Sequence, residues 1–170
     1  MNITIKQATA ADIPIIEDIL AGAVAWMDSI DQHLWEYADV QWDAMARFYG
    51  CTPANFYIAY ADDQSGDGQS AACMALFDYD ATFWPDIAPG ESLYLHKIAV
   101  RRAFAGQGVS QALINFARDE AKKRGIATLR LDTHVGRHKV RAVYEKQGFV
   151  CVEETVLFGK YATALYVCEL

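Results

Sequence analysis

A run of small residues, Ala105-Gly106-Gln107-Gly108-Val109-Ser110, separates an apolar strand pattern at 93–100 from a helical pattern that follows it. A diphosphate needs several N–H groups that converge on it, and the first four amides of a helix have no partner inside that helix. Gly106 and Gly108 let the backbone approach a ligand closely and adopt positive φ. The run therefore predicts a cradle for a phosphorylated ligand, although Gly-x-Gly alone also fits a plain flexible turn.

Two common nucleotide motifs are absent from this run. It lacks the Gly-Lys-Ser/Thr that grips a triphosphate and magnesium in a P-loop. It also lacks the three spaced glycines of a dinucleotide fingerprint. The expected grip is therefore one of main-chain amides, to which the Ser110 hydroxyl could add.

His96 and Tyr144 are the side chains best suited to acid–base chemistry, and each has a second interpretation. An imidazole titrates near neutral pH, so His96 in the strand 93–100 fits a general base or a hydrogen-bonded core histidine. Tyr144 shares a helix face with Val140, and by spacing alone it fits a core aromatic.

The strand 93–100, the small-residue run with its helix, and Val143-Tyr144-Glu145-Lys146-Gln147-Gly148-Phe149 together resemble the GNAT superfamily of acyl-CoA-dependent N-acetyltransferases. The resemblance is close over 93–156, whereas the N-terminal half agrees in element order only. It implies an α/β fold with a mixed, mostly antiparallel sheet, a splayed central strand pair and helices on both faces. It also implies acetyl-CoA as co-substrate and no metal.

By this resemblance, the family's Arg/Gln-x-x-Gly-x-Gly/Ala motif falls on 105–110. Ala105 replaces the usual Arg or Gln, and Ser110 replaces Gly or Ala. Since the grip relies on main-chain amides, the loop should survive both changes. Arg137 stands where the family has Asn, and its expected contact is a phosphate or pantetheine oxygen. The backbone groups that would meet the pantetheine arm belong to Ile98, Ala99 and Val100.

The resemblance also assigns roles in the chemistry. Tyr144 would be the acid that protonates the departing thiolate, and a main-chain N–H in 98–100 would stabilise the oxyanion. His96 stands at or near a position that is often Glu, and it would take the amine proton directly or through water. His134 and His138 have the spacing of a metal pair, but they do not share one helix and no third ligand is near, so we expect no metal there.

The charges divide sharply along the chain. Residues 1–92 carry a net charge of −13 and residues 93–170 a net charge of +6. This split suggests an anionic ligand on the later half and a cationic one near the earlier half, although plain surface charge would give it too. The amine acceptor would then lie near Trp35, Trp84 and Asp31. Nucleic acid is not expected, because no basic run with interleaved aromatics occurs.

Periodicity predicts eleven elements in one domain, 1–170. A homodimer is compatible with the sequence. We expect a cytoplasmic location, since no signal peptide or apolar run long enough to span a membrane is present. Cys51, Cys73, Cys151 and Cys168 are expected to be reduced packing residues. The expected strands are 2–8, 56–61, 71–79, 93–100, 128–133, 149–156 and 162–170, and the expected helices are 13–27, 40–49, 109–124 and 138–147.

The sequence thus predicts an N-acetyltransferase that moves an acetyl group from acetyl-CoA to a primary amine of a small molecule by direct transfer. A non-catalytic acyl-CoA-binding regulatory module of the same fold is the alternative, favoured by Ala105, Arg137 and the missing Glu. A nucleotide-binding protein is a third interpretation, and it requires ATP to stabilise the fold more than CoA does.

Overall fold

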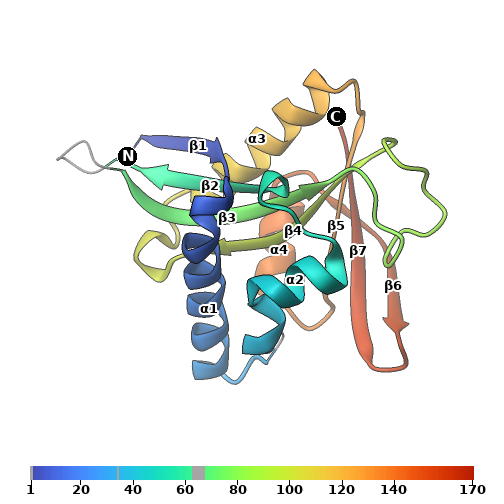
Figure 1. Cartoon of the computed structure of the whole chain (residues 1–170). Coiled ribbons are helices and arrows are strands. Elements are labelled where there is room, and N and C mark those ends of the chain that lie inside the picture. The colour runs from blue at the N-terminus through green and yellow to red at the C-terminus, as the bar shows by residue number, and fades with distance from the viewer. Residues whose placement is uncertain (1, 34, 63–67) are drawn as a thin grey trace. The chain divides into compact units, whose positions relative to one another are not determined.

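The computed structural model describes residues 2–33, 35–62 and 68–170. Its contacts divide the chain into two compact units, which we describe separately: unit 1 is Met1–Ala75 with Lys97–Leu113, and unit 2 is Leu76–His96 with Ile114–Leu170. The elements follow the predicted order (Figure 1). They are β1 (Ile3–Gln7), α1 (Ile13–Ser29), α2 (Trp42–Tyr49), β2 (Phe56–Ala61), β3 (Gln69–Phe77), β4 (Leu93–Val100), α3 (Val109–Lys123), β5 (Thr128–His134), α4 (His138–Lys146), β6 (Val150–Leu157) and β7 (Tyr161–Glu169).

The strands form one seven-stranded sheet in the order β1-β2-β3-β4-β5-β7-β6. Antiparallel pairing joins β1 to β2, β2 to β3, β5 to β7 and β7 to β6. Strands β4 and β5 run parallel, which requires the crossover that α3 supplies. The predicted α/β class with a mixed, mostly antiparallel sheet is confirmed.

The parallel pair β4–β5 is hydrogen-bonded over only part of its length. Its recorded register covers Leu93–Leu95 opposite Leu129–Leu131 and ends before His96 and Asp132. The next residue of β4, Lys97, has a φ of 52°. A non-glycine residue rarely occupies this left-handed region, so the strand departs from regular geometry there. Both features agree with the predicted splay of the central strands.

Unit 1 is built on the β1–β2–β3 ladder and the amphipathic helix α1. Strand β2 is buried along nearly its whole length, and Trp42 of α2 packs on Phe56 with ring centroids 5.8 Å apart. The hairpin predicted between β2 and β3 is confirmed by their pairing, while residues 63–67 of its loop lie outside the described residues. The buried face of α1 comprises Ile16, Ile19, Leu20, Val24 and Met27.

The start of α1 carries the capping box that the sequence predicts. The Asp12 carboxylate accepts hydrogen bonds from the Thr9 amide and the Thr9 hydroxyl, both at 2.8 Å. The amide bond, followed by the hydroxyl bond, outweighs the opposing effect of burial and lowers the pKa of Asp12. This carboxylate therefore stabilises the fold above the ordinary Asp pKa, and the stabilisation is lost as the pH falls through the lowered value.

We expect Asp12→Ala to lower the free energy of unfolding by about 1 kcal/mol at neutral pH, as the loss of a helix cap does. The difference from wild type should vanish in acid, where the carboxyl group is protonated in both states. Urea unfolding at neutral and acidic pH measures this effect, with Asp119→Ala, on the exposed side of α3, as the control. A deficit that persists unchanged in acid would contradict the capping role.

Unit 2 contains the β5–β7–β6 part of the sheet and the helix α4. Strands β6 and β7 form the long hairpin seen in Figure 1, as predicted. Arg141 of α4 donates to the Tyr166 hydroxyl of β7 at 2.8 Å and to the Val135 carbonyl at 2.9 Å. The Tyr166 hydroxyl in turn donates to Glu145 at 2.9 Å. These bonds fasten α4 to β7 and so fix the position of Tyr144.

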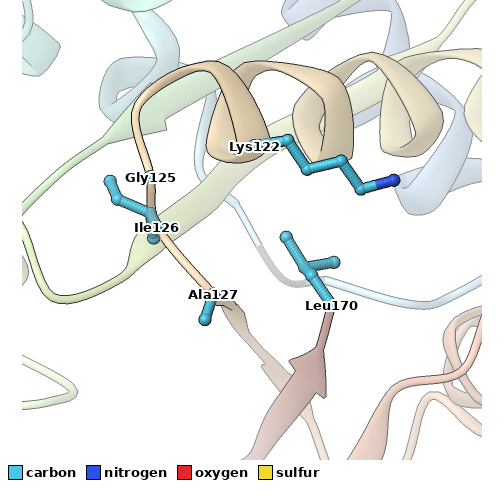
Figure 2. A pocket seen from close by; sticks show the side chains of 5 residues that line it. All are labelled: Lys122, Gly125, Ile126, Ala127 and Leu170. Carbon is cyan, nitrogen blue, oxygen red and sulfur yellow. The ribbon is translucent and has the colours of Figure 1, made fainter.

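Helix α3 ends at the predicted glycine. Gly125 has a φ of 69°, and the amide of Ile126 donates to the Ala121 carbonyl at 2.9 Å, which closes the last turn. A shallow depression beyond this end is lined by Lys122, Gly125, Ile126, Ala127 and Leu170 (Figure 2). It contains none of the predicted site residues, and Lys122 is its one ionisable side chain.

All four cysteines are free thiols, as expected. Cys51, Cys73 and Cys168 are buried, and burial raises the pKa of Cys51 to about 11 and that of Cys73 to about 12. Such thiols stay protonated and act as packing groups. Among the described residues, no helix combines the length and apolar character needed to cross a membrane.

Candidate functional site

The loop 105–110, here called the amide cradle, lies in unit 1 and leads into α3. A single 3-10 turn, Arg102–Phe104, precedes it. Gly106 and Gly108 adopt φ of 76° and 83°, which a residue with a side chain adopts only under strain. A Cβ atom added at either glycine would have no protein atom within 4 Å. The surface above both glycines is therefore open on the protein side.

Most amides of the cradle have no recorded hydrogen-bond partner. Within the turn, Ala105 donates to Arg102 at 3.2 Å and Gln107 donates to Phe104 at 3.4 Å. The first bond of the helix runs from Ala112 to the Gly108 carbonyl. No bond is recorded for the amides of four other loop residues in this described segment: Gly106, Gly108, Val109 and Ser110. These are the donors that a diphosphate requires, so the loop fits such a group.

The β4 residues predicted to meet the pantetheine arm are also in unit 1. Ala99 is buried, while Ile98 and Val100 are half-buried. Arg101 follows them and donates through its amide to the Ala71 carbonyl at 2.8 Å. Its guanidinium bonds the Ser70 carbonyl at 2.8 Å and Asp18 at 2.5 Å. This anchors the segment that leads from β4 into the cradle.

Tyr144 lies on α4 in unit 2, half-buried between two aromatic rings. Its ring centroid is 6.0 Å from that of Phe149 and 6.3 Å from that of Tyr166. Burial raises the pKa of Tyr144 to about 12, against the opposing charge of Arg137, and the charge of Asp132 raises it further. The hydroxyl therefore stays protonated throughout the neutral range and is equipped to donate a proton.

Arg137 occupies the N-cap position of α4 and shares this electrostatic environment. Burial lowers the pKa of its guanidinium, while the neighbouring Tyr144 raises it. Its positive charge favours the phenolate form of Tyr144, and that is the form left behind after the hydroxyl has donated its proton. The structure thus places Arg137 beside Tyr144.

His96 lies between two carboxylates in unit 2. Its Nε2 is 2.9 Å from Oδ2 of Asp80, and its Nδ1 is 3.5 Å from Oδ1 of Asp132. The imidazole also packs against Phe77 and Phe83, with centroids 5.6 and 6.1 Å away. Sequence reasoning singled out His96 and missed the two aspartates as its partners. Asp80 belongs to an irregular connection, whereas Asp132 was expected only to end a strand.

The predicted acceptor residues separate between the units. In unit 1, the Lys97 ammonium lies 4.7 Å from the Trp35 ring centroid, so this ring already receives a cation. Asp31 is exposed and lies 3.2 Å from His33. In unit 2, Trp84 is only 8% exposed and packs in a core cluster with Tyr94 and Leu165. That burial gives Trp84 a packing role and leaves it little surface for a ligand.

The two histidines near α4 do not form a pair on one helix. His134 ends β5 and accepts a hydrogen bond from the Gly136 amide at 3.0 Å through Nδ1. His138 is the first residue of α4. Their separate elements agree with the argument made from the sequence.

Comparisons with known proteins add to this geometry. The sequence model of the acetyltransferase (GNAT) family matches residues 26–149. An uncharacterized N-acetyltransferase of Bacillus subtilis (strain 168), YesJ, is 32% identical over 87 residues, which are 49% of this chain and 48% of YesJ. The chain therefore spans about half the length of this curated relative.

Two solved structures share the fold. A GNAT-family acetyltransferase from Listeria monocytogenes 4b F2365 has a TM-score of 0.77 and 21% identity, covering 99% of this chain and 95% of that one. A GNAT-family acetyltransferase from Elizabethkingia anophelis, solved with acetyl-CoA bound, has a TM-score of 0.65 and 20% identity, covering 99% of both chains. The family match spans well over half of the sequence, and these structures agree in fold, so this chain belongs to the acetyltransferase (GNAT) family.

Proposed function

We propose that this protein transfers the acetyl group of acetyl-CoA to a primary amine of a small molecule by direct transfer. The observation that carries the proposal is the set of amides without recorded partners in the cradle, at the positions of the family's CoA motif. The Elizabethkingia anophelis relative of the same fold binds acetyl-CoA. A diphosphate of this kind is the ligand that such amides suit.

In this proposal the cradle grips the diphosphate through its backbone. The amides of Gly106, Gly108, Val109 and Ser110 donate to phosphate oxygens, and the helix dipole of α3 adds favourable charge. Ala105 offers only its backbone, so one side-chain contact that is usual in the family is missing. The backbone of Ile98, Ala99 and Val100 meets the pantetheine arm, and one of their amides stabilises the carbonyl oxygen as it becomes anionic.

Tyr144 acts as the general acid. Direct transfer forms a C–N bond and breaks a C–S bond, and the departing thiolate needs a proton. The high pKa of Tyr144 keeps that proton on the hydroxyl until the thiolate develops. Arg137 then stabilises the phenolate that remains. The protein regains the proton from solvent before the next turnover.

His96 acts as the general base, directly or through one water. Most alkylamines are protonated at neutral pH and must lose a proton before they can attack a carbonyl. An imidazole is suited to this because it titrates in the same range. On the acceptor side, Trp35 and Asp31 provide an aromatic face and a negative charge that suit an amine.

Acetyl-CoA turnover tests the proposal. Purified protein is mixed with acetyl-CoA and a panel of primary amines, and release of free thiol is followed together with the mass of each amine. Release above the rate without enzyme, with an amine heavier by one acetyl group, is expected. Release at the rate without enzyme for every amine would refute the enzyme.

Thermal shifts in the same samples separate the alternatives. A ligand at 100 times its Kd stabilises a fold by about 2.7 kcal/mol, so CoA should raise the Tm clearly. Stabilisation by CoA without turnover would identify a non-catalytic CoA-binding module. Stronger stabilisation by ATP than by CoA would identify a nucleotide-binding protein.

A further inference from the structure

Asp80, His96 and Asp132 form a compact cluster within unit 2, and they come from three different segments. Asp80 lies in the connection after β3, His96 on β4 and Asp132 on β5. One ligand atom from each lies within 4.8 Å of the other two. The side chains of His96 and Asp132 are 22% and 21% exposed, whereas that of Asp80 is 7% exposed. The cluster thus has a buried side at Asp80 and an accessible side at Asp132.

Asp80 is held rigidly in its ionised form. Its Oδ1 accepts hydrogen bonds from the amides of Thr82 at 3.0 Å and Phe83 at 3.1 Å, and its Oδ2 faces His96 Nε2 at 2.9 Å. Burial acts to raise the pKa of Asp80, but the hydrogen bond and charge of His96 and the two amide bonds lower it overall. An ionised carboxylate only accepts, so Nε2 must carry the hydrogen. In the neutral ring, the lone pair is then on Nδ1.

On the other side of the ring, Nδ1 faces a second acceptor. Oδ1 of Asp132 lies 3.5 Å from Nδ1. Two acceptors at this separation converge on a donor with several hydrogens, and an ammonium group is such a donor. Asp132 also raises the pKa of Tyr144 by its charge, so the same carboxylate acts on the base and on the acid of the proposed reaction.

We infer that Asp132 binds the acceptor amine as its alkylammonium ion, that His96 Nδ1 removes the proton, and that Asp80 positions His96 for this step. The inference rests on the proposed function and narrows its substrate class to amines that are cationic at neutral pH. The ammonium N–H bond breaks and an Nδ1–H bond forms. The nitrogen keeps its electron pair for attack, and the imidazolium lies between two carboxylates until solvent takes the proton.

A metal ion is the competing occupant of these three groups, and the ring geometry disfavours it. Nε2 faces Asp80 and Nδ1 faces Asp132, and the two nitrogens point away from each other across the imidazole. One cation bound to either nitrogen therefore meets only one of the two carboxylates. The cluster is better suited to transfer of a proton than to chelation.

The test compares two isomeric acceptors, benzylamine, which is cationic at neutral pH, and 4-methylaniline, which is neutral. Asp132→Asn should raise the KM of benzylamine by about 10- to 100-fold, the size of a lost charge-assisted interaction. It should leave the kinetics of 4-methylaniline within about threefold. Asp119→Asn, on the exposed side of α3, is the matched control and should change neither. Equal effects of Asp132→Asn on both amines would overturn the inference and leave acetyl transfer intact.

Asp80→Asn tests the positioning role by its pH profile. The loss of a carboxylate that stabilises the imidazolium should move the acidic limb of kcat/KM to lower pH and lower its plateau by about 10²- to 10⁴-fold. Asp80 and Asp132 are the charged groups recorded against the ring. A variant that loses Tm but keeps the wild-type pH profile would show that Asp80 is only structural.

Binding gives a readout that does not depend on turnover. In ¹⁵N spectra of the imidazoles, millimolar benzylammonium should shift the His96 nitrogens in the wild-type protein and not in Asp132→Asn. A shift without turnover would uphold the ammonium site while the proposed function fails. Unmoved His96 signals would overturn the inference, as would loss of the effect in EDTA with recovery on adding Zn²⁺.

Discussion

Tyr144→Phe is expected to lower kcat by about 10²- to 10⁴-fold, the range typical of acid–base residues, while the Kd for CoA stays nearly unchanged. The substitution removes only the hydroxyl, so the ring keeps its packing against Phe149 and Tyr166. The loss should therefore fall on the departure of the thiolate and not on the fold. Steady-state kinetics and calorimetric titration with CoA measure the two quantities.

The pH profile makes this prediction more specific. Because the pKa of Tyr144 is about 12, the acid stays protonated across the range in which enzymes are assayed. We expect no loss of wild-type activity from Tyr144 ionisation below about pH 11. Tyr161→Phe, at an exposed position of β7, is the matched control and should keep the wild-type kcat. A Tyr144→Phe variant with unchanged kcat would remove Tyr144 from the mechanism.

Gly108→Val is expected to abolish CoA binding and, with it, all turnover. Gly108 has a φ of 83°, so a β-branched residue cannot keep the backbone conformation without strain. The new side chain would also project into the open space where the diphosphate is expected to sit. Calorimetric titration should show no CoA binding at concentrations that saturate the wild-type protein.

The control for this variant separates strain from ligand contact. Gly159 lies in the β6–β7 turn with a φ of 69° and equally open surroundings. Gly159→Val should lose comparable stability but bind CoA normally. If both valine variants bound CoA as wild type does, the cradle would not be the CoA site. If Tyr144→Phe and Gly108→Val behaved alike, the assignment of acid and cradle to different residues would be wrong.

Local chemistry explains why most elements were predictable. Gly125 ends α3 where the helical pattern stops, and Thr9 with Asp12 caps the start of the first helical segment. The alternation of β-branched and aromatic residues gave β4 its bounds, Leu93–Val100, without error. Periodicity also predicted the buried face of α3 through Val109, Leu113, Ala117 and Ala121, and missed Ile114, which is equally buried.

The partners of His96 were beyond local reasoning. Asp80 is 16 residues away in sequence and reaches the imidazole only because an irregular turn folds back over β4. Its Asx-like bonding to Thr82 and Phe83 marks a turn but does not reveal what the second oxygen meets. For Asp132 a signal did exist. Leu93 and Leu95 align with Leu129 and Leu131, which brings His96 and Asp132 to the next level of the parallel pair.

Trp84 shows the opposite error, that of reading chemistry into a packing residue. A tryptophan between prolines and acidic residues suggested an exposed aromatic wall. Instead its ring is stacked by the Arg130 guanidinium at 4.6 Å and buried beside Tyr94. Composition cannot distinguish these two environments, because both require a large apolar side chain near a charge.

The central claim is that the amides of the cradle hold the diphosphate of CoA. Titration of ¹⁵N-labelled protein with CoA, followed by amide spectra, tests it most directly. We predict that the resonances of Gly106, Gly108, Val109 and Ser110 shift more than any others and saturate together. Saturable CoA binding that leaves these four resonances in place would contradict the account.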